Sequence, residues 1–145
     1  MVRTFKKISH SIYEHKYHIV FCPKYRYRIF KGDIAVFARS HIYKLLGQKD
    51  KVEVVELNIQ PDHVHIILDV PPKYSISNLM GFLKGRLASN MFRHYDRLGK
   101  KLWGRHLWSR GYCSSTIGLD EERIRRYVKW QEKQDKEAEQ LGLDI

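Results

Sequence analysis

The sequence has little of what stabilises secreted proteins or anchors membrane proteins. Its 145 residues include two cysteines, Cys22 and Cys113, which are too few to indicate a disulfide framework or a cysteine-based zinc site. No apolar run approaches the roughly 20 residues that a membrane-spanning helix needs, and the N-terminus shows no signal-peptide pattern. We therefore expect a cytoplasmic protein with reduced thiols.

The chain also lacks repeats, low-complexity tracts and linkers rich in Pro, Gly or Ser that would divide it. A single domain over residues 1–145 is the prediction. Residues 132–145 carry charges of both signs, a composition typical of a solvated helix end or tail.

Acidic residues are scarce before that segment. The chain carries 27 Lys and Arg against 16 Asp and Glu, which gives a net charge of +11 and a pI near 9.7. Residues 1–31 hold eight Lys and Arg against Glu14 alone, and residues 84–110 hold eight against Asp96 alone. Aromatic residues lie among these charges, so nucleic acid is the favoured partner, and a charge kept for solubility is the alternative.

Apolar periodicity predicts the element order β-α-β-β-α-β followed by a helix. This order indicates an α+β, ferredoxin-like antiparallel sheet with helices on one face and an additional C-terminal helix. The predicted strands cover residues 17–22, 52–59 and 64–70, with a short strand within 108–116, and the predicted helices cover 33–47, 77–94 and the segment after Asp120.

Local sequence features refine these elements. In the second strand we expect Val55, Leu57 and Ile59 on one face, and a turn at residues 60–62 should form a hairpin with the third strand. Ser77 is the expected N-cap of the second helix. Asp120 is the expected N-cap of the last helix, with Leu119 and Ile124 forming a hydrophobic staple.

Two histidines bracket one apolar residue at the start of the third predicted strand. His63 and His65 are two residues apart, so their imidazoles share a face, while Val64, Ile66 and Leu68 alternate onto the opposite, apolar face. A His pair on the less apolar face of a packed strand is a good place to hold a metal ion. A surface or structural pair of histidines is the alternative.

Tyr127 and Gln131 are four residues apart on the last predicted helix and share a face. Combined with the His pair they suggest a neutral set of two imidazoles and one amide oxygen, which leaves a divalent ion its full charge to polarise a phosphate. A tyrosine with an ordinary pKa near ~10 is a poor nucleophile at neutral pH unless a metal ion or cations stabilise the phenolate. By itself a helical tyrosine usually packs.

These motifs, in this order, resemble one family. The chain is similar over most of residues 12–131 to the single-tyrosine HUH transposases of insertion sequences that move as single-stranded DNA. The resemblance is carried by residues 17–21 (YHIVF), 23–26 (PKYR), 61–65 (PDHVH), 71–75 (PPKYS), 83–85 (LKG), 107–112 (LWSRGY) and 127–131 (YVKWQ).

The resemblance implies a metal-dependent enzyme that nicks and rejoins DNA. His63, His65 and Gln131 would bind Mg²⁺ or Mn²⁺, and Tyr127 would form a 5′-phosphotyrosine intermediate. It also implies a prokaryotic homodimer, acting at the nucleoid on single-stranded element ends with hairpins, in which the tyrosine helix of one chain can complete the His site of the other.

The basic stretches supply candidate DNA contacts. Lys24, Arg26 and Arg28 alternate with Tyr25 and Tyr27, which offers phosphate contacts and stacking surfaces in turn. An amphipathic strand or a partly buried aromatic cluster is the alternative for this patch and for a second one at Trp103, Arg105, His106 and Trp108. The DNA contacts expected overall are Lys24, Tyr25, Arg26, Arg28, Lys84, Arg86, Arg105 and Arg110.

Two other functions remain open at this point. One is a related HUH nickase, either a replication initiator or a domesticated transposase acting on repeated palindromes. The other is a non-catalytic single-strand nucleic-acid-binding domain on the same scaffold, which would need neither the metal ion nor Tyr127.

Overall fold

The computed structural model describes residues 6–8, 11–13, 15–102 and 106–142. Its strands are β1 (Lys6–Ile8), β2 (Ser11–Tyr13), β3 (Lys16–Phe21), β4 (Glu53–Gln60), β5 (His63–Asp69) and β6 (Cys113–Ser115). Its helices are a 3₁₀ turn η1 (Lys24–Arg26), α1 (Asp33–Leu46), α2 (Ile76–His94), α3 (Asp96–Lys101) and α4 (Glu121–Gln140). No helix in these ranges is long and apolar enough to cross a membrane. Sequence reasoning did not anticipate α3 or the β1–β2 hairpin.

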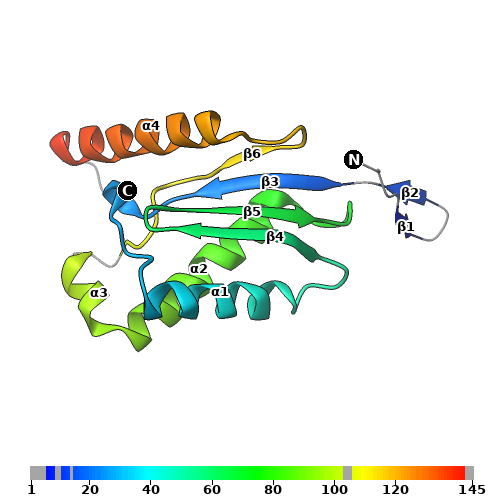
Figure 1. Cartoon of the computed structure of the whole chain (residues 1–145), viewed down its shortest axis with the longest axis horizontal. Coiled ribbons are helices and arrows are strands. Elements are labelled where there is room, and N and C mark those ends of the chain that lie inside the picture. Colours follow the sequence, from blue (N-terminus) through cyan, green and yellow to red (C-terminus); the bar gives the residue numbers. More distant parts are fainter. Residues whose placement is uncertain (1–5, 9–10, 14, 103–105, 143–145) are drawn as a thin grey trace.

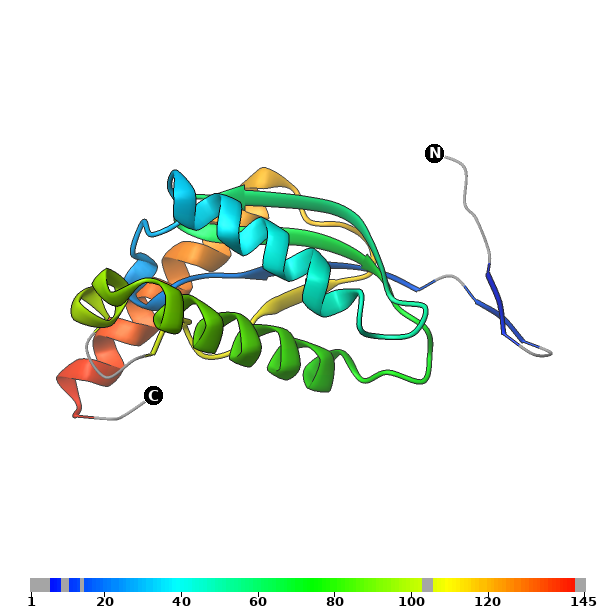
Figure 2. The ribbon, with the colours of Figure 1, turned by 90° about the horizontal axis from the view of Figure 1, so that it is seen from below.

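Four strands form one antiparallel sheet in the order β4-β5-β3-β6. Helices α1 and α2 cover one face of this sheet, and α4 lies alone over the other face (Figure 1). Seen from below, α1 and α2 run side by side across the sheet, and the β1–β2 hairpin lies beyond its end (Figure 2). The predicted ferredoxin-like α+β architecture with an extra C-terminal helix is confirmed.

The main core lies between the sheet and the pair α1 and α2. Val64, Ile66 and Leu68 of β5 are fully buried and face this core, as the alternating pattern predicted. Ile42 of α1 and Leu87 of α2 are also fully buried and belong to the same cluster. The predicted hairpin is confirmed as well, because a two-residue turn joins β4 to β5 and pairs Gln60 with His63. His63 and His65 lie on the opposite face of β5, together with Ile67 and Asp69.

Two local predictions are wrong. The register of β4 against β5 shifts between Val54 and Glu56, so Val55 is the extra residue of a β-bulge. Val55 is therefore exposed, whereas Leu57 is buried in the core. The N-cap of α2 is Ser75, whose side chain accepts a hydrogen bond from the backbone N–H of Asn78, so the helix begins earlier than Ser77.

Helix α4 begins as predicted and ends differently. The Asp120 carboxylate accepts a hydrogen bond from the N–H of Arg123 at 2.8 Å, and Leu119 packs with Ile124. The helix then continues regularly to Gln140, with Asp135 completely buried. The expectation of a solvated helix end is wrong for Asp135, since tertiary partners outweigh the polarity of the segment.

Candidate functional site

The candidate site lies on the sheet face that α4 covers. The strand register places Asn58, His65, Val20 and Cys113 in one row across β4, β5, β3 and β6. Val20 packs against Ile124 and Val128 of α4, so the helix axis passes over the middle of this row. The two histidines therefore lie beside the helix, on the side of the β4 edge.

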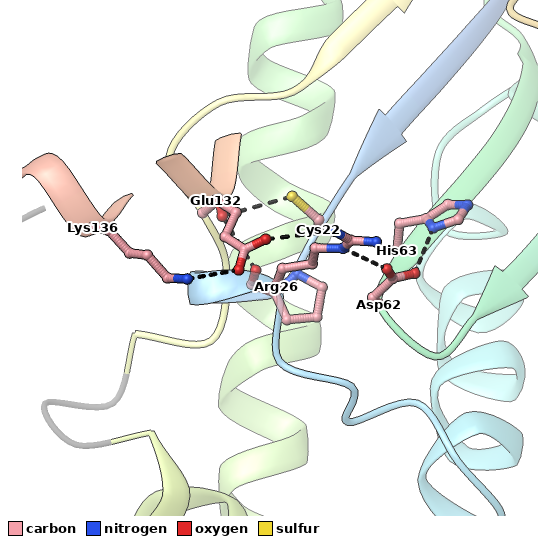
Figure 3. Close-up of polar contacts among 8 residues, drawn as sticks. Cys22, Arg26, Asp62, His63, Glu132 and Lys136 are labelled. Atoms are coloured by element: carbon pink, nitrogen blue, oxygen red, sulfur yellow. Dashed lines mark hydrogen bonds and ion pairs between the residues drawn. The ribbon is translucent and has the colours of Figure 1, made fainter. Parts of the chain in front are cut away.

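His63 is held by a carboxylate that a guanidinium holds in turn. Its Nδ1 lies 2.8 Å from Oδ1 of Asp62, and Oδ2 of Asp62 accepts a hydrogen bond from Nε of Arg26 at 2.8 Å (Figure 3). Burial would by itself raise the pKa of Asp62, but the hydrogen bonds from Arg26 and His63 outweigh it and hold that pKa below its ordinary value. Asp62 is therefore ionised and can only accept hydrogen bonds.

His65 is partly buried, like His63. Its Nε2 is buried without a hydrogen-bond partner in the part of the chain that the structure describes. Burial lowers the pKa of His65, and the nearby rings of His18 and His63 lower it further against the influence of Glu56. The imidazole is thus kept neutral, the form that binds metal ions.

His18, whose spacing in the sequence does not indicate a site residue, lies beside His65 with ring centroids 5.6 Å apart. It stands on the same face of neighbouring β3. Only the strand pairing, which links residues far apart in sequence, could have found it.

An open cavity of about 460 Å³ lies next to the histidines. It is lined by Arg26, Asn58, Gln60, Asp62, His63, His65, Leu119, Glu121, Ile124, Arg125 and Val128. Its floor comes from the β4–β5 hairpin and one wall from α4. Both predicted histidine ligands open onto it, so the structure brings them together as expected.

The tyrosine and the glutamine lie elsewhere on α4. Neither Tyr127 nor Gln131 is among the described residues that line the cavity. Tyr127 packs with Cys113 against Val20 and Val128, which places it on the flank of α4 that faces β6. In the single chain the structure thus keeps Tyr127 and Gln131 together but does not bring them to the His pair.

Tyr127 and Gln131 form a short polar chain with Asp135. The Tyr127 hydroxyl donates to Oε1 of Gln131 at 3.4 Å, and Nε2 of Gln131 donates to Oδ1 of Asp135 at 3.3 Å. Burial strongly raises the pKa of Tyr127, and the charges of Cys22, Cys113 and Asp135 raise it further. In this arrangement the phenol is protonated at neutral pH and is not a prepared nucleophile.

Asp135 of α4 lies on the same side of the sheet as the candidate site, and it was not identified from the sequence. Its Oδ2 accepts hydrogen bonds from the backbone N–H of Tyr25 at 3.0 Å and from the hydroxyl of Ser109 at 2.6 Å. Tyr25 has a positive φ of 57°, a strained conformation for a residue with a side chain. The Asp135 carboxylate therefore joins the C-terminal half of α4 to η1 and to the segment before β6.

The candidate DNA contacts divide into buried and exposed side chains. Lys24 is buried, and Arg26 is engaged by Asp62 and, at 3.5 Å, by Glu132. Residues 24–26 form the turn η1, and the rings of Tyr25 and Tyr27 lie 5.6 Å apart. The partly buried aromatic cluster, the alternative considered for this segment, thus describes it better than an extended basic strip.

Lys84 is also embedded. Its ammonium donates to the carbonyl oxygens of Ser109 at 3.0 Å and Gly111 at 2.6 Å, and burial lowers its pKa to about 8. These contacts favour a structural role. Arg28, Arg86 and Arg110 are exposed, so DNA contact stays a prediction for them.

In the second patch, Trp108 packs against Phe21 and Phe30 and donates to the carbonyl of Lys84. It is therefore part of the packing rather than a free stacking surface. His106 is exposed, and Trp103 and Arg105 lie outside the described residues.

The chain is similar over most of its length to transposases of bacterial insertion sequences. It is 38% identical over 138 residues to the transposase for insertion sequence element IS200 of Salmonella typhimurium, covering 95% of this chain and 90% of that protein. It is 34% identical over 127 residues to the ISDra2 transposase TnpA of Deinococcus radiodurans, covering 87% of this chain and 90% of that protein.

Solved structures agree. A crystal structure of a Deinococcus radiodurans protein classed as a transposase superposes with a TM-score of 0.78 at 29% identity, covering 87% of this chain and 97% of the other. A tyrosine transposase associated with REP sequences, bound to a REP hairpin, gives a TM-score of 0.53 at 13% identity, covering 86% of this chain and 69% of the other, and shows the fold alone.

These relatives and the shared fold define a class: the protein is a transposase, a DNA-processing enzyme. The model of the family described as "Transposase IS200 like" matches residues 11–131. The chain belongs to this IS200-like family, and the resemblance found in its motifs is confirmed.

Proposed function

We propose that this transposase nicks and rejoins single-stranded DNA at the ends of its insertion sequence through a 5′-phosphotyrosine at Tyr127. His63, His65 and Gln131 would hold the Mg²⁺ or Mn²⁺ ion. The observation that carries the proposal is the pair of imidazoles at an open cavity, with Nε2 of His65 buried and unbonded among the described residues. A buried nitrogen without a partner is costly unless a ligand completes it.

The residues present fit a divalent ion in part. Two neutral imidazoles are suitable ligands for Mn²⁺ and weaker ones for Mg²⁺. No group of three or more His, Cys, Asp or Glu side chains within the described ranges is arranged to hold a metal ion. The amide oxygen of Gln131 is therefore the natural third protein ligand, and an ion bound there would polarise the scissile phosphate.

Because Tyr127 and Gln131 lie on the far flank of α4, the active site needs a second arrangement of this helix. We propose that α4 brings Tyr127 and Gln131 to a cavity lined by His63 and His65. This cavity belongs either to the same chain, after a shift of α4, or to a second copy in a homodimer. Gly118, with φ of 101°, stands between β6 and α4 in a conformation that favours glycine and would allow the turn to change.

The chemistry exchanges one phosphodiester bond for another. The Tyr127 oxygen attacks phosphorus in line, its proton leaves, and the bond to the 3′ oxygen breaks, which yields a 5′-phosphotyrosine and a free 3′-hydroxyl. A 3′-hydroxyl then attacks the tyrosyl phosphate, the bond between phosphorus and the Tyr127 oxygen breaks, and the phenol regains a proton, so that a DNA strand is rejoined. Leaving its partly buried position beside Cys113 removes the burial that raises the pKa of Tyr127, so delivery also favours the phenolate.

A denaturing gel tests the proposal directly. The protein is incubated with Mn²⁺ and single-stranded DNA that carries the flanks of its own gene. A covalent protein–DNA band is expected for the unchanged chain and is expected to vanish in Tyr127→Phe. A band that persists in Tyr127→Phe would remove this residue as the nucleophile.

The same gel addresses the shared site. Tyr127→Phe and His65→Ala are each expected to be inactive alone. Mixing them should restore the band if one chain supplies the tyrosine and the other the histidines, whereas a site completed within each chain predicts no recovery.

A further inference from the structure

Asp62 occupies a position that sets the chemistry of His63. It is the second residue of the turn between β4 and β5, it is 8% exposed, and each of its oxygens has a partner. Oδ1 lies 2.8 Å from Nδ1 of His63, and Oδ2 accepts from Nε of Arg26. The Asp62 carboxylate that pairs with the Arg26 guanidinium offers only acceptors, so we infer that Nδ1 of His63 is the donor in this contact.

This assignment leaves Nε2 as the unprotonated nitrogen of a neutral His63. We propose that Asp62 is a positioning residue: its carboxylate, locked by Arg26, fixes the His63 ring and its tautomer so that Nε2 is presented as a metal ligand. The inference rests on the proposed function, which makes His63 a ligand. Carboxylates that accept from the second nitrogen of a ligating histidine also orient the ring and raise its basicity.

Arg26 gives Asp62 its fixed geometry and connects it to the tyrosine helix. The backbone of Arg26 has a positive φ of 55°, an uncommon conformation for a residue with a side chain. Its guanidinium lies between Asp62 and Glu132 of α4, and Glu132 is paired with Lys136 at 2.9 Å (Figure 3). Arg26, which the sequence suggested as a DNA contact, is therefore assigned to the support of His63.

Nitrogen NMR reads the tautomer without metal or DNA. In protein labelled with ¹⁵N at the imidazoles, at about pH 8.5, where an ordinary imidazole is neutral, His63 is expected to be protonated at Nδ1. In Asp62→Asn the amide can present either its oxygen or its NH₂ group, so the preference for Nδ1–H should weaken or reverse. A His63 protonated at Nε2 in the unchanged protein overturns the proposal, whether or not the variant folds.

Metal binding supplies the second measurement. Asp62→Asn is expected to weaken Mn²⁺ binding, followed by the signal of free Mn²⁺ in electron paramagnetic resonance, by about 10- to 100-fold. Asp50→Asn is the matched control, because it removes the same charge from an exposed pair with Lys73. Equal Mn²⁺ affinity in the unchanged protein and Asp62→Asn overturns the role of Asp62.

Different results would refute the proposed function and the positioning role of Asp62. If the unchanged protein forms no covalent DNA band, the proposed function fails, and the tautomer result still stands as a structural fact. If the band forms with the same dependence on Mn²⁺ concentration in Asp62→Asn and in Asp50→Asn, the function stands and the positioning role is refuted.

Discussion

The two faces of the sheet are covered in different ways. Between the sheet and helices α1 and α2 lies a continuous apolar core that draws on β3, β4, β5 and all three helices α1 to α3. Between the sheet and α4, the buried apolar cluster of the described residues consists of Val20, Ile124 and Val128, with Cys113, Leu119 and Tyr127 packed partly buried against it, and hydrogen bonds and ion pairs supply further contacts. The face that α1 and α2 cover is stabilised by extensive apolar burial. The face that α4 covers combines a small apolar contact with histidines, a cavity and buried carboxylates.

This difference bears on how the site works. Fully burying a valine or isoleucine contributes roughly 1.5–3 kcal/mol, so this small cluster attaches α4 far more weakly than the main core attaches α1 and α2. Hydrogen bonds of Arg26 and Asp135 supplement this apolar contact and fix the orientation of α4 on the sheet. We expect that a helix held in this way can be displaced without unfolding the sheet, as the proposed delivery of Tyr127 requires.

The largest expected effect lies on the apolar face. Leu87 of α2 is fully buried in the main core, so Leu87→Ala should lower the free energy of unfolding by about 2–5 kcal/mol, measured by urea denaturation. Val36→Ala on α1 is the control, because Val36 is 70% exposed and its loss should cost under about 0.5 kcal/mol. Similar losses for the two variants would contradict a core on this side.

The next effect joins the two faces and depends on pH. Lys84 reaches from α2 to the carbonyl of Ser109, whose hydroxyl donates to Asp135 of α4. Burial lowers the pKa of Lys84 from 10.5 to about 8 in the folded protein. Between these values the unfolded chain binds the proton and the folded one does not, so the contribution of Lys84 to stability rises with pH.

Urea denaturation of the unchanged protein and of Lys84→Met across this range measures the effect. The difference in unfolding free energy should shift in favour of the unchanged protein by up to about 3 kcal/mol from pH 8 to 10.5. Cys22, whose pKa burial raises to about 11, is present in both proteins and largely cancels. If the difference in unfolding free energy stays constant with pH, the pKa of Lys84 in the folded protein is not lowered.

What the sequence could predict follows the same division. On the apolar face, alternation in β5 placed Val64, Ile66 and Leu68 correctly, and helical periodicity located α1, because burial there follows local spacing. The bulge at Val55 was not predicted, because it is set by pairing with β5 and leaves no pattern in the sequence of β4 itself. The N-cap of α2 is Ser75 and not Ser77. The sequence could not distinguish these two serines, because the choice depends on where the preceding turn ends.

On the α4 face, local patterns were less informative. Helical spacing correctly put Tyr127 beside Gln131, but it does not say which flank of the helix faces the His pair. The burial of Asp135 was not predictable from a segment of mixed charge, because two of its three partners, a hydroxyl and a backbone N–H, are far away in sequence. Functional faces depend on such long-range polar contacts more than structural faces do.

The smallest expected effect tests whether α4 is held separately from the main core. Asp135→Ala leaves the backbone N–H of Tyr25 and the side-chain amide of Gln131 without their acceptor, and the Ser109 hydroxyl keeps only the carbonyl of Pro23 at 3.2 Å, a loss of about 1–3 kcal/mol. If α4 opens on its own, the loss appears as local opening rather than global unfolding. Amide hydrogen exchange in α4 should then accelerate roughly 5- to 150-fold while the amides of β3 and β5 stay protected.

Glu137→Ala is the matched control for this measurement, because it removes an exposed carboxylate from the same helix and should leave exchange nearly unchanged. Equal acceleration in α4, β3 and β5 of Asp135→Ala would show that α4 unfolds only together with the sheet. In that case the thin apolar contact beneath α4 would not make it a movable element, and Tyr127 would have to reach a His cavity by a rearrangement of the whole domain.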